Sequence, residues 1–347
     1  MRVLMVGLGG IGQRHLRNLR TLLGDNLEVL AYRVRRHSHT LTDQLSIEAQ
    51  TGLEEKYRVQ VYADLDEALA RKPDAVFVCN PTSLHLPVAL KAVRAGCHLF
   101  MEKPVADNLE NIDELLRIIE SQGLVSMVGY QLRFHPCLLQ LHRLLQQGAI
   151  GRVLSVRAEV GEYLPAWHPY EDYRQMYAAR RDLGGGVILS QIHEFDYLYW
   201  LFGMPRRLMT LGGKLSSLEI DVEDTASTLM ECIVDKHVVP VHLHQDYVQR
   251  PPSRNCQVIG DAGKILVDLR NLTVQCFDGE GRLSDNFSCE SFQRNQLFLD
   301  ELKHFLACIS RREQAQVSVR DGVQSLRMAL AAKASLATGQ IVELKGC

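Results

Sequence analysis

Through roughly the first 120 residues, short apolar runs alternate with segments whose apolar positions recur every three or four residues. The apolar runs predict buried strands at residues 2–6, 27–32, 75–79, 97–101 and 125–129. The segments between them predict helices at residues 11–23, 66–70, 84–95 and 109–121. Strands and helices in alternation are typical of a parallel sheet with helices on both faces.

The pattern changes after residue 129. Apolar and polar residues now alternate in segments joined by tight turns, which favours an antiparallel sheet. Strands are predicted at residues 153–160, 207–211, 225–234, 238–246, 256–259 and 264–268, and helices at 136–147, 190–201, 292–310 and 321–337. We therefore expect an α/β domain over residues 1–125 and an α+β domain with a large open sheet over residues 126–347. The last helix is placed to pack back on the first domain.

The composition indicates a globular protein. Hydrophobic residues make up 46% of the chain and charged residues 23%, with a net charge of −2. This balance argues against nucleic acid or a membrane surface as an electrostatic partner, and no apolar run approaches the ~20 residues of a membrane span. The chain starts at once with a strand, and its nine cysteines contain no Cys-x-x-Cys pair. We expect a cytoplasmic protein without a structural metal.

A glycine-rich loop follows the first strand directly and opens the first helix. It reads Gly7-Leu8-Gly9-Gly10-Ile11-Gly12, a G-x-G-x-x-G motif. Gly7 allows a tight turn, Gly9 lets the backbone approach a pyrophosphate, and Gly12 lets helix and strand pack closely. The helix N-terminus favours an anion, so we predict a dinucleotide site in a Rossmann domain. The alternative is a plain glycine turn.

The end of the second predicted strand bears on which dinucleotide binds. Enzymes that use NAD usually place a carboxylate there for the ribose diol, but this chain has Tyr32 and Arg33, followed by Arg35 and Arg36. Arginine pairs with a 2′-phosphate, which favours NADP(H) over NAD(H). The alternative is a solvated basic loop beside an unselective site.

Polar residues also follow the strand predicted at 75–79. Asn80, Pro81 and His85 stand at the carboxyl end of that strand, where parallel sheets face their cofactors. We predict that these three residues contact the cofactor. The alternative is that this turn only caps the next helix.

The segment Glu102-Lys103-Pro104 ends the strand predicted at 97–101. The proline restricts Lys103 to an extended conformation, so the backbone sets the direction of the side chain. A lysine there can reach the reacting end of a dinucleotide bound at the glycine loop, although a solvated lysine is the simpler alternative.

Together, the glycine loop, the Asn80–His85 segment, Glu102-Lys103-Pro104 and residues 184–196 resemble the Gfo/Idh/MocA (glucose–fructose oxidoreductase / inositol dehydrogenase) family over nearly the whole chain. The resemblance implies that Lys103 and His193 flank the substrate carbon that exchanges hydride. A histidine can take the hydroxyl proton, and a lysine ammonium can steady the developing alkoxide. It also implies cofactor contacts from Glu102, Lys103 and Gln131, and a Lys103–Pro104 bond that can be cis.

The chain departs from the family at one place. Many members carry an aspartate three or four residues before the histidine, where this chain has Ser190 and Leu189. Asp196 follows His193 by three residues and could share its helix face and orient it. The proton relay is therefore open to question.

Substrate contacts are expected from Lys103, His193, Ser190, Arg133, Trp167 and Tyr177. Arg133 could instead tie a helix to the sheet, and the aromatic and basic loop at residues 163–181 could be only a packed lid. His242 and His244 share a strand face but have no evident third metal ligand, so no metal site is predicted.

The leading hypothesis is an NAD(P)-dependent oxidoreductase that acts on a secondary alcohol or ketone of a sugar, nucleotide sugar or cyclitol. A hydrolase or epimerase that retains its nicotinamide and a non-catalytic dinucleotide sensor are the alternatives. The open sheet of the family implies a homodimer or homotetramer.

Overall fold

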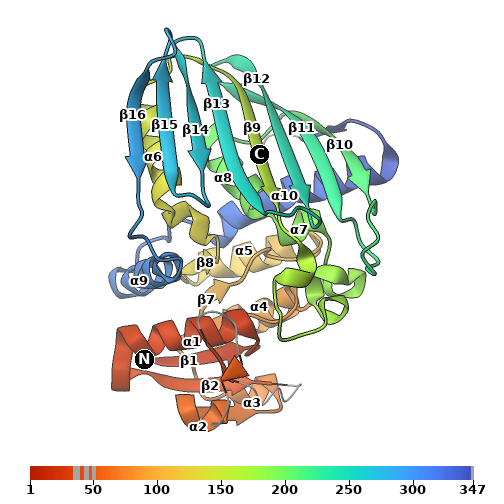
Figure 1. Cartoon of the computed structure of the whole chain (residues 1–347). Coiled ribbons are helices and arrows are strands. Elements are labelled where there is room, and N and C mark those ends of the chain that lie inside the picture. The colour runs from red at the N-terminus through yellow and green to blue at the C-terminus, as the bar shows by residue number, and fades with distance from the viewer. Residues whose placement is uncertain (34–39, 43–46, 49–51, 345–347) are drawn as a thin grey trace.

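The computed structural model describes residues 1–33, 40–42, 47–48 and 52–344. Two sheets dominate it, one in each half of the chain (Figure 1). The first has six parallel strands in the order β5-β2-β1-β6-β7-β8. These strands are β1 (Arg2–Val6), β2 (Glu28–Tyr32), β5 (Val59–Tyr62), β6 (Ala75–Val78), β7 (His98–Met101) and β8 (Ser126–Val128). This is the Rossmann order, and it reverses between β1 and β6, where such sheets bind their ligands.

Helices cover both faces of the parallel sheet because its strands are apolar on both sides. One face packs on α1 (Gly10–Leu23) and, from the far end of the chain, on α9 (Asn295–Arg311). The opposite face packs on α3 (Leu65–Leu69), α4 (His85–Arg94) and α5 (Ile112–Ser121). A short helix α2 (Leu53–Tyr57) and a small pair, β3 (Thr40–Leu41) and β4 (Ile47–Glu48), flank the sheet.

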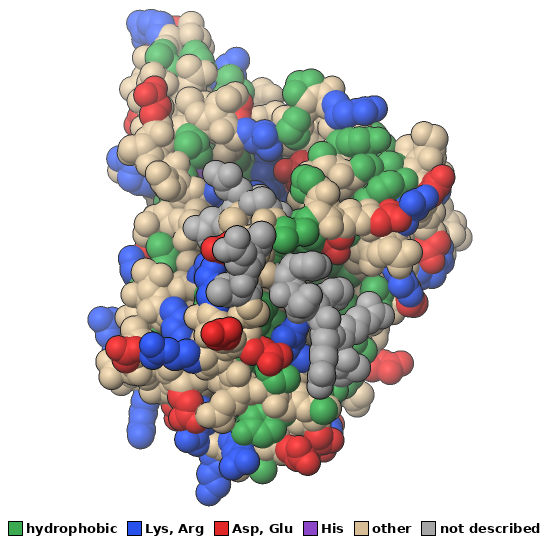
Figure 2. Space-filling view, turned by 60° about the horizontal axis from the view of Figure 1, so that its bottom comes forward, with side chains coloured by type: hydrophobic (Ala, Val, Ile, Leu, Met, Phe, Trp, Pro, Cys, Tyr) green, Lys and Arg blue, Asp and Glu red, His purple; other side chains and the backbone are tan. Residues whose placement is uncertain are grey.

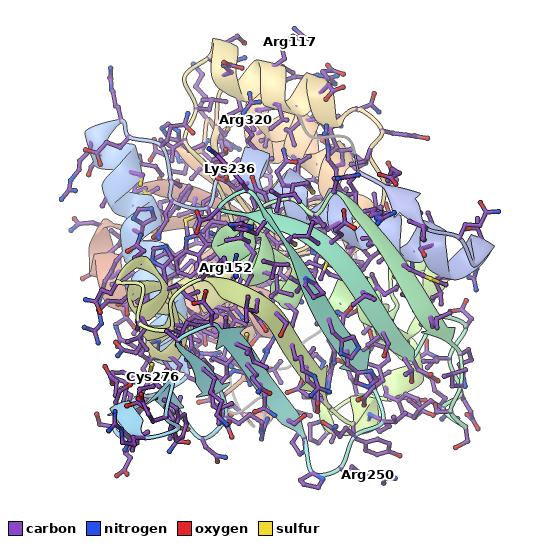
Figure 3. The ribbon with its side chains drawn as sticks, turned by 90° about the horizontal axis from the view of Figure 1, so that it is seen from above. Arg117, Arg152, Lys236, Arg250, Cys276 and Arg320 are labelled. Carbon is purple, nitrogen blue, oxygen red and sulfur yellow. The ribbon has the colours of Figure 1, made fainter. Side chains whose placement is uncertain are left out.

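The second sheet has nine strands in the order β16-β15-β14-β13-β9-β12-β11-β10-β17. They are β9 (Val153–Gly161), β10 (Arg207–Gly213), β11 (Thr225–Val234), β12 (His237–Asp246), β13 (Ser253–Gly260), β14 (Gly263–Asp268), β15 (Thr273–Asp278), β16 (Leu283–Ser288) and β17 (Val342–Glu343). All pairs are antiparallel except β9 with β12. The expected mostly antiparallel sheet is confirmed. Figure 3 looks onto it from above, with Lys236 and Arg250 near its opposite ends.

Helices line the inner face of this sheet. They are α6 (Pro136–Gln146), α7 (Val187–Ser190), α8 (His193–Phe202) and α10 (Val319–Thr338), and α6 follows a 3-10 turn, η3 (Gln131–Phe134). Helix α10 touches both domains. It packs along β10, while a Cβ built on Gly322 would lie 2.7 Å from Val128 and 2.9 Å from Val105. Just before α10, the carbonyl of Val317 accepts a hydrogen bond of 2.9 Å from the Val128 amide.

The structure differs from the sequence prediction in several places. The short elements α2, β3, β4 and β17 and the strands β5, β15 and β16 were not predicted, and in the last three strands polar and exposed positions hide the apolar signal. Strand β13 begins at Ser253, three residues earlier than expected. The single helix predicted at 190–201 is two helices, α7 and α8, interrupted at Gln191 and Ile192.

Acidic and basic side chains are interspersed on the face shown in Figure 2. Among the helices that the structure describes, none is long and apolar enough to cross a membrane.

Candidate active site

The glycine loop joins β1 to α1 as the motif requires. Gly7 has φ +89°, and a Cβ on it would lie 2.7 Å from the Cys79 carbonyl oxygen. A Cβ on Gly12 would lie 2.1 Å from the Gly7 carbonyl oxygen, so only glycine fits without movement. A Cβ on Gly9 would meet no atom within 4 Å, which leaves the space that a pyrophosphate needs. Gly10 begins α1, and the first turn, which includes Ile11, carries no acidic residue, so its free N–H groups can donate hydrogen bonds to an anion.

Two further loops end strands beside this one. Asn80 and Pro81 follow β6, and Glu102, Lys103 and Pro104 follow β7. The buried ring of His85 joins them, with Nε2 2.8 Å from the Asn80 carbonyl oxygen and Nδ1 2.8 Å from the Pro104 carbonyl oxygen. These contacts indicate that His85 holds the two loops together. Direct cofactor contact by Asn80, Pro81 and His85 stays a prediction.

Glu102 is buried directly after β7, and its partner is His15 on α1. The His15 Nε2 atom lies 2.6 Å from the Glu102 Oε1 atom. This contact ties the first helix of the dinucleotide loop to the end of β7. The sequence analysis missed His15, because a lone histidine inside a helix carries no signal of its own.

A second buried carboxyl lies near Glu102. Glu301 on α9 is fully buried, and neither of its oxygens has a hydrogen-bond partner among the described residues. Burial raises the pKa of Glu301 well above its ordinary value, and the charge of Glu102 adds to the effect. Burial therefore favours the neutral form of the Glu301 carboxyl.

Lys103 and His193 meet at the domain boundary. The Lys103 Nζ atom donates a hydrogen bond of 2.8 Å to the carbonyl oxygen of Ser190, three residues before His193. The Lys103–Pro104 bond is cis, as the resemblance suggested. The His193 ring is buried against Tyr130, with ring centroids 5.7 Å apart. Ser190 thus reaches the lysine through its backbone.

His193 is held in its neutral form. Burial lowers the pKa of His193 well below its ordinary value, and the positive charges of Lys103, Arg254 and Arg294 lower it further. Its Nδ1 atom is buried and has no hydrogen-bond partner among the described residues. A neutral imidazole beside an ammonium can accept a proton from a substrate hydroxyl that the ammonium polarises.

The idea that Asp196 orients His193 is wrong in this structure. The Asp196 carboxylate accepts hydrogen bonds of 2.7 and 2.9 Å from the Arg133 guanidinium, and another of 3.1 Å from the Ser325 hydroxyl. Arg133 is itself buried and lies over the Trp200 ring, 5.0 Å from its centroid. These contacts support the structural alternative for Arg133, in which the side chain links the turn η3 to helix α8. Substrate binding by Arg133 is left as a prediction without support from its contacts.

The acid that follows His193 has a different partner. Glu194 is buried and accepts two hydrogen bonds, of 2.7 and 2.9 Å, from Arg254 on β13. This bidentate pair fixes the start of α8 against the sheet and brings a second cation to His193. Sequence reasoning missed Arg254, since nothing in its neighbourhood marks it.

The other predicted site residues lie on separate segments of the chain. Gln131 begins η3 and is half-buried, and Trp167 packs edge-on against Tyr247 with ring centroids 5.3 Å apart. Tyr177 is half-buried in the loop before Gly184. Arg33 lies at the end of β2, where its guanidinium pairs with Glu54 at 3.2 Å. Arg35 and Arg36 lie outside the described residues.

Two family models match this chain. Residues 1–130 match an oxidoreductase family with an NAD-binding Rossmann fold, and residues 138–266 match the Gfo/Idh/MocA C-terminal domain. The chain belongs to the Gfo/Idh/MocA oxidoreductase family. It is thus an oxidoreductase with a dinucleotide-binding first domain, and the resemblance noted from the motifs is confirmed.

Similar proteins match along the full length. A myo-inositol 2-dehydrogenase of Thermotoga maritima is 28% identical, with 99% of both chains covered. The scyllo-inositol 2-dehydrogenase (NAD⁺) of Bacillus subtilis is 24% identical over 99% of this chain and 96% of its own. Among solved structures, the WlbA dehydrogenase from Bordetella pertussis, in complex with NADH and UDP-GlcNAcA, has a TM-score of 0.80 at 21% identity and covers 100% of this chain and 99% of its own. At this identity the structural likeness bears on the fold alone.

Proposed function

We propose that this protein transfers hydride between a nicotinamide cofactor and a secondary alcohol or ketone of a sugar or cyclitol. One observation carries the proposal: at the end of β7, in the sheet that also bears the glycine loop, the Lys103 ammonium is fixed on the Ser190 carbonyl, three residues before the buried His193, and its charge acts on that histidine. The names of the relatives, which include inositol dehydrogenases and a 1,5-anhydro-D-fructose reductase, support the substrate class.

The proposed chemistry divides between the two residues. In the oxidation direction, His193 takes the proton of the substrate hydroxyl while the hydrogen on carbon leaves as hydride. Lys103 donates a hydrogen bond to the same oxygen and stabilises the charge that develops on it. The bound nicotinamide would supply the hydride acceptor, held by Gly7–Gly12, Asn80, Pro81, Glu102 and Gln131. In reduction the same steps run backwards.

A substrate screen with both cofactors tests this function. Inositols, free sugars and nucleotide sugars are incubated with NAD⁺ and NADP⁺, and the absorbance of reduced nicotinamide is followed. We expect stoichiometric reduction with members of one class. Conversion of a substrate with no net change in free cofactor would instead indicate the cofactor-retaining hydrolase or epimerase.

We also propose a preference for NADP(H), because β2 ends in Tyr32 and Arg33 without a carboxylate. The Arg33 side chain has only 5% exposure and pairs with Glu54, so a 2′-phosphate would have to compete with that carboxylate. We expect Arg33→Asp to weaken NADPH binding at least tenfold and to leave NADH binding equal or tighter. The matched variant Glu54→Gln should tighten NADPH binding. Fluorescence titration measures the NADPH and NADH affinities of the wild type and of both variants, and a wild type that binds NADH more tightly contradicts the proposal.

We propose that the outer face of the nine-stranded sheet forms a homodimer or homotetramer interface. Strand β11 alternates buried and outward residues, and the exposed apolar side chains on the outer face include Leu211, Leu229, Ile233 and Val238. Exposed apolar groups on one sheet face favour association. Light scattering at working concentration should give a dimer or tetramer, and Leu229→Glu should shift it toward monomer. A monomeric wild type would contradict this interface.

We propose a cytoplasmic location, which is supported by eight described cysteines that are all free.

A further inference from the structure

A series of direct contacts joins the dinucleotide loop to Lys103. His15 lies on α1, three residues after Gly12, the last glycine of the loop. Its Nε2 atom lies 2.6 Å from the Glu102 Oε1 atom, and the Oε2 atom of Glu102 accepts a hydrogen bond of 3.3 Å from the Lys103 amide. The Lys103 ammonium in turn reaches the Ser190 carbonyl oxygen at 2.8 Å. Helix α1 is thus joined to the lysine through a single carboxylate.

Packing fixes the His15 ring for this one contact. The ring is fully buried, and the rings of Phe100 and Phe298 lie edge-on to it, with centroids 4.9 and 6.1 Å away. Its Nδ1 atom has no hydrogen-bond partner among the described residues, so the ring makes its one hydrogen bond there to Glu102. A carboxylate only accepts hydrogen bonds, so His15 is the donor. The ring therefore holds one oxygen of Glu102 in place.

The Glu102 carboxylate is also confined from another side. A Cβ built on Gly129, directly after β8, would lie 3.0 and 3.3 Å from the two oxygens of Glu102. These distances are shorter than ordinary van der Waals contact, so a side chain at this position would have to displace the carboxylate. Glu102 is buried, and a buried carboxylate is costly unless donors surround it. The imidazole and the Lys103 amide supply those donors.

The position of Lys103 matters for the proposed chemistry. A donor stabilises a developing alkoxide only where it is held in place, and a displacement of about 1 Å can cost on the order of 10²-fold in rate. The hydrogen bond from the Lys103 amide to Glu102 anchors the backbone at the base of the lysine side chain. A carboxylate that has lost His15 can move, and the backbone of Lys103 can move with it.

We propose that His15 is a positioning residue, which acts through Glu102 to fix Lys103 relative to the dinucleotide loop. The N-terminus of the same helix would bind the pyrophosphate, so this link sets the place of the lysine with respect to the bound cofactor. The effect of His15 on rate rests on the proposed function, whereas its effect on the Lys103 backbone rests on the contacts alone.

Two substitutions separate the hydrogen bond of His15 from its packing. His15→Phe keeps an aromatic ring among the phenylalanines but removes the donor, and His15→Gln keeps an N–H group that can reach the Glu102 carboxylate. The matched control is His98→Phe. His98 begins β7, at the opposite end of the strand from Glu102, and its Nδ1 atom accepts a hydrogen bond of 3.0 Å from the Val125 amide.

Hydrogen exchange of the Lys103 amide tests the positioning without any turnover. It is followed by mass spectrometry on protein loaded with reduced cofactor. We expect exchange at least tenfold faster in His15→Phe, because the acceptor oxygen of Glu102 is no longer held. His15→Gln and His98→Phe should stay within about threefold of wild type. Unchanged exchange in His15→Phe would overturn the inference.

Steady-state kinetics and cofactor titration test the effect on rate. His15→Phe should lower kcat at least tenfold with cofactor affinity within about threefold of wild type, and His15→Gln should recover most of the loss. Independent effects multiply in rate, but His15→Phe should lower the residual rate of Lys103→Met by less than twofold, because it acts through that lysine. Multiplied losses in the double variant, or weaker cofactor binding with unchanged kcat, would overturn the inference.

Gly129→Ala reaches the same carboxylate from β8 and decides the question if His15→Phe does not fold. It should speed exchange of the Lys103 amide and lower kcat at least threefold, and a Gly129→Ala variant that behaves as wild type in both would then overturn the inference. If the wild type reduces no nicotinamide with any sugar or cyclitol, the proposed function fails. Exchange of the Lys103 amide still decides in that case whether His15 positions the lysine.

Discussion

Replacing Lys103 by Met is expected to lower kcat by about 10³-fold or more while cofactor affinity stays within about threefold of wild type. The substitution keeps the length of the side chain but removes the ammonium that reaches the Ser190 carbonyl oxygen at 2.8 Å. Without it, nothing at this position can stabilise the alkoxide. The exposed Lys303, which pairs with Asp300 at 3.4 Å, offers the matched control Lys303→Met.

His193→Asn should cause a loss of similar size, because it removes the base. In the wild type, the acid limb of kcat/KM for oxidation should lie below 6.5, the ordinary pKa of histidine, since burial and three cations lower the pKa of His193. Protonation of His193 stops turnover only as pH falls through that lowered value. Full activity in either variant would remove that residue from the mechanism, and steady-state kinetics with cofactor titration measure both effects.

The second large effect is expected at the glycine loop. Gly9→Ala should weaken cofactor binding at least tenfold and leave the melting temperature unchanged. A methyl group at Gly9 meets no protein atom within 4 Å, and the residue has an ordinary extended backbone with φ −71°. The added carbon would fill only the space that the pyrophosphate needs.

Gly12→Ala should differ, because its Cβ would lie 2.1 Å from the Gly7 carbonyl oxygen. The loop would have to move, so the variant should lose cofactor binding and about 1–3 kcal/mol of stability together. Gly52→Ala, which also has open space around its Cβ, should change neither property. Thermal unfolding and fluorescence titration separate the cases. Unchanged cofactor affinity in Gly9→Ala would place the pyrophosphate elsewhere.

Local patterns were enough to predict the parallel sheet, the glycine loop and the position of Lys103. Each depends on residues that are neighbours in sequence, and the periodicity of apolar positions reports them directly. The prediction of a single helix over residues 190–201 was wrong because of contacts with residues that are distant in the sequence. The side-chain amide of Gln191 donates to the Asp246 carbonyl at 3.0 Å, and the backbone carbonyl of Gln191 accepts from the Gln245 side chain at 2.8 Å, so this residue bonds to β12 at the point where the helix breaks.

The partners of charged residues were beyond local prediction for the same reason. Asp196 was expected to orient His193 because the two share a helix, but the Asp196 carboxylate is hydrogen-bonded to Arg133, 63 residues earlier. His15 and Glu102 are 87 residues apart, and Arg254 and Glu194 are 60 apart. Such pairs form because burying a charge is costly unless an opposite charge lies beside it, and the fold brings the two residues together. The spacing of the residues in the sequence does not indicate which ones will pair.

The central claim is direct hydride transfer at the Lys103–His193 pair, and isotope tracing tests it most directly. The substrate found in the screen is prepared with deuterium on the carbon to be oxidised, and the reduced cofactor is analysed by mass spectrometry. We predict one deuterium on each reduced nicotinamide formed by the wild type, and formation of deuterium-labelled cofactor by Lys103→Met that is slower by about 10³-fold or more. A reduced cofactor without deuterium, or formation of labelled cofactor by the variant at the wild-type rate, would contradict the account.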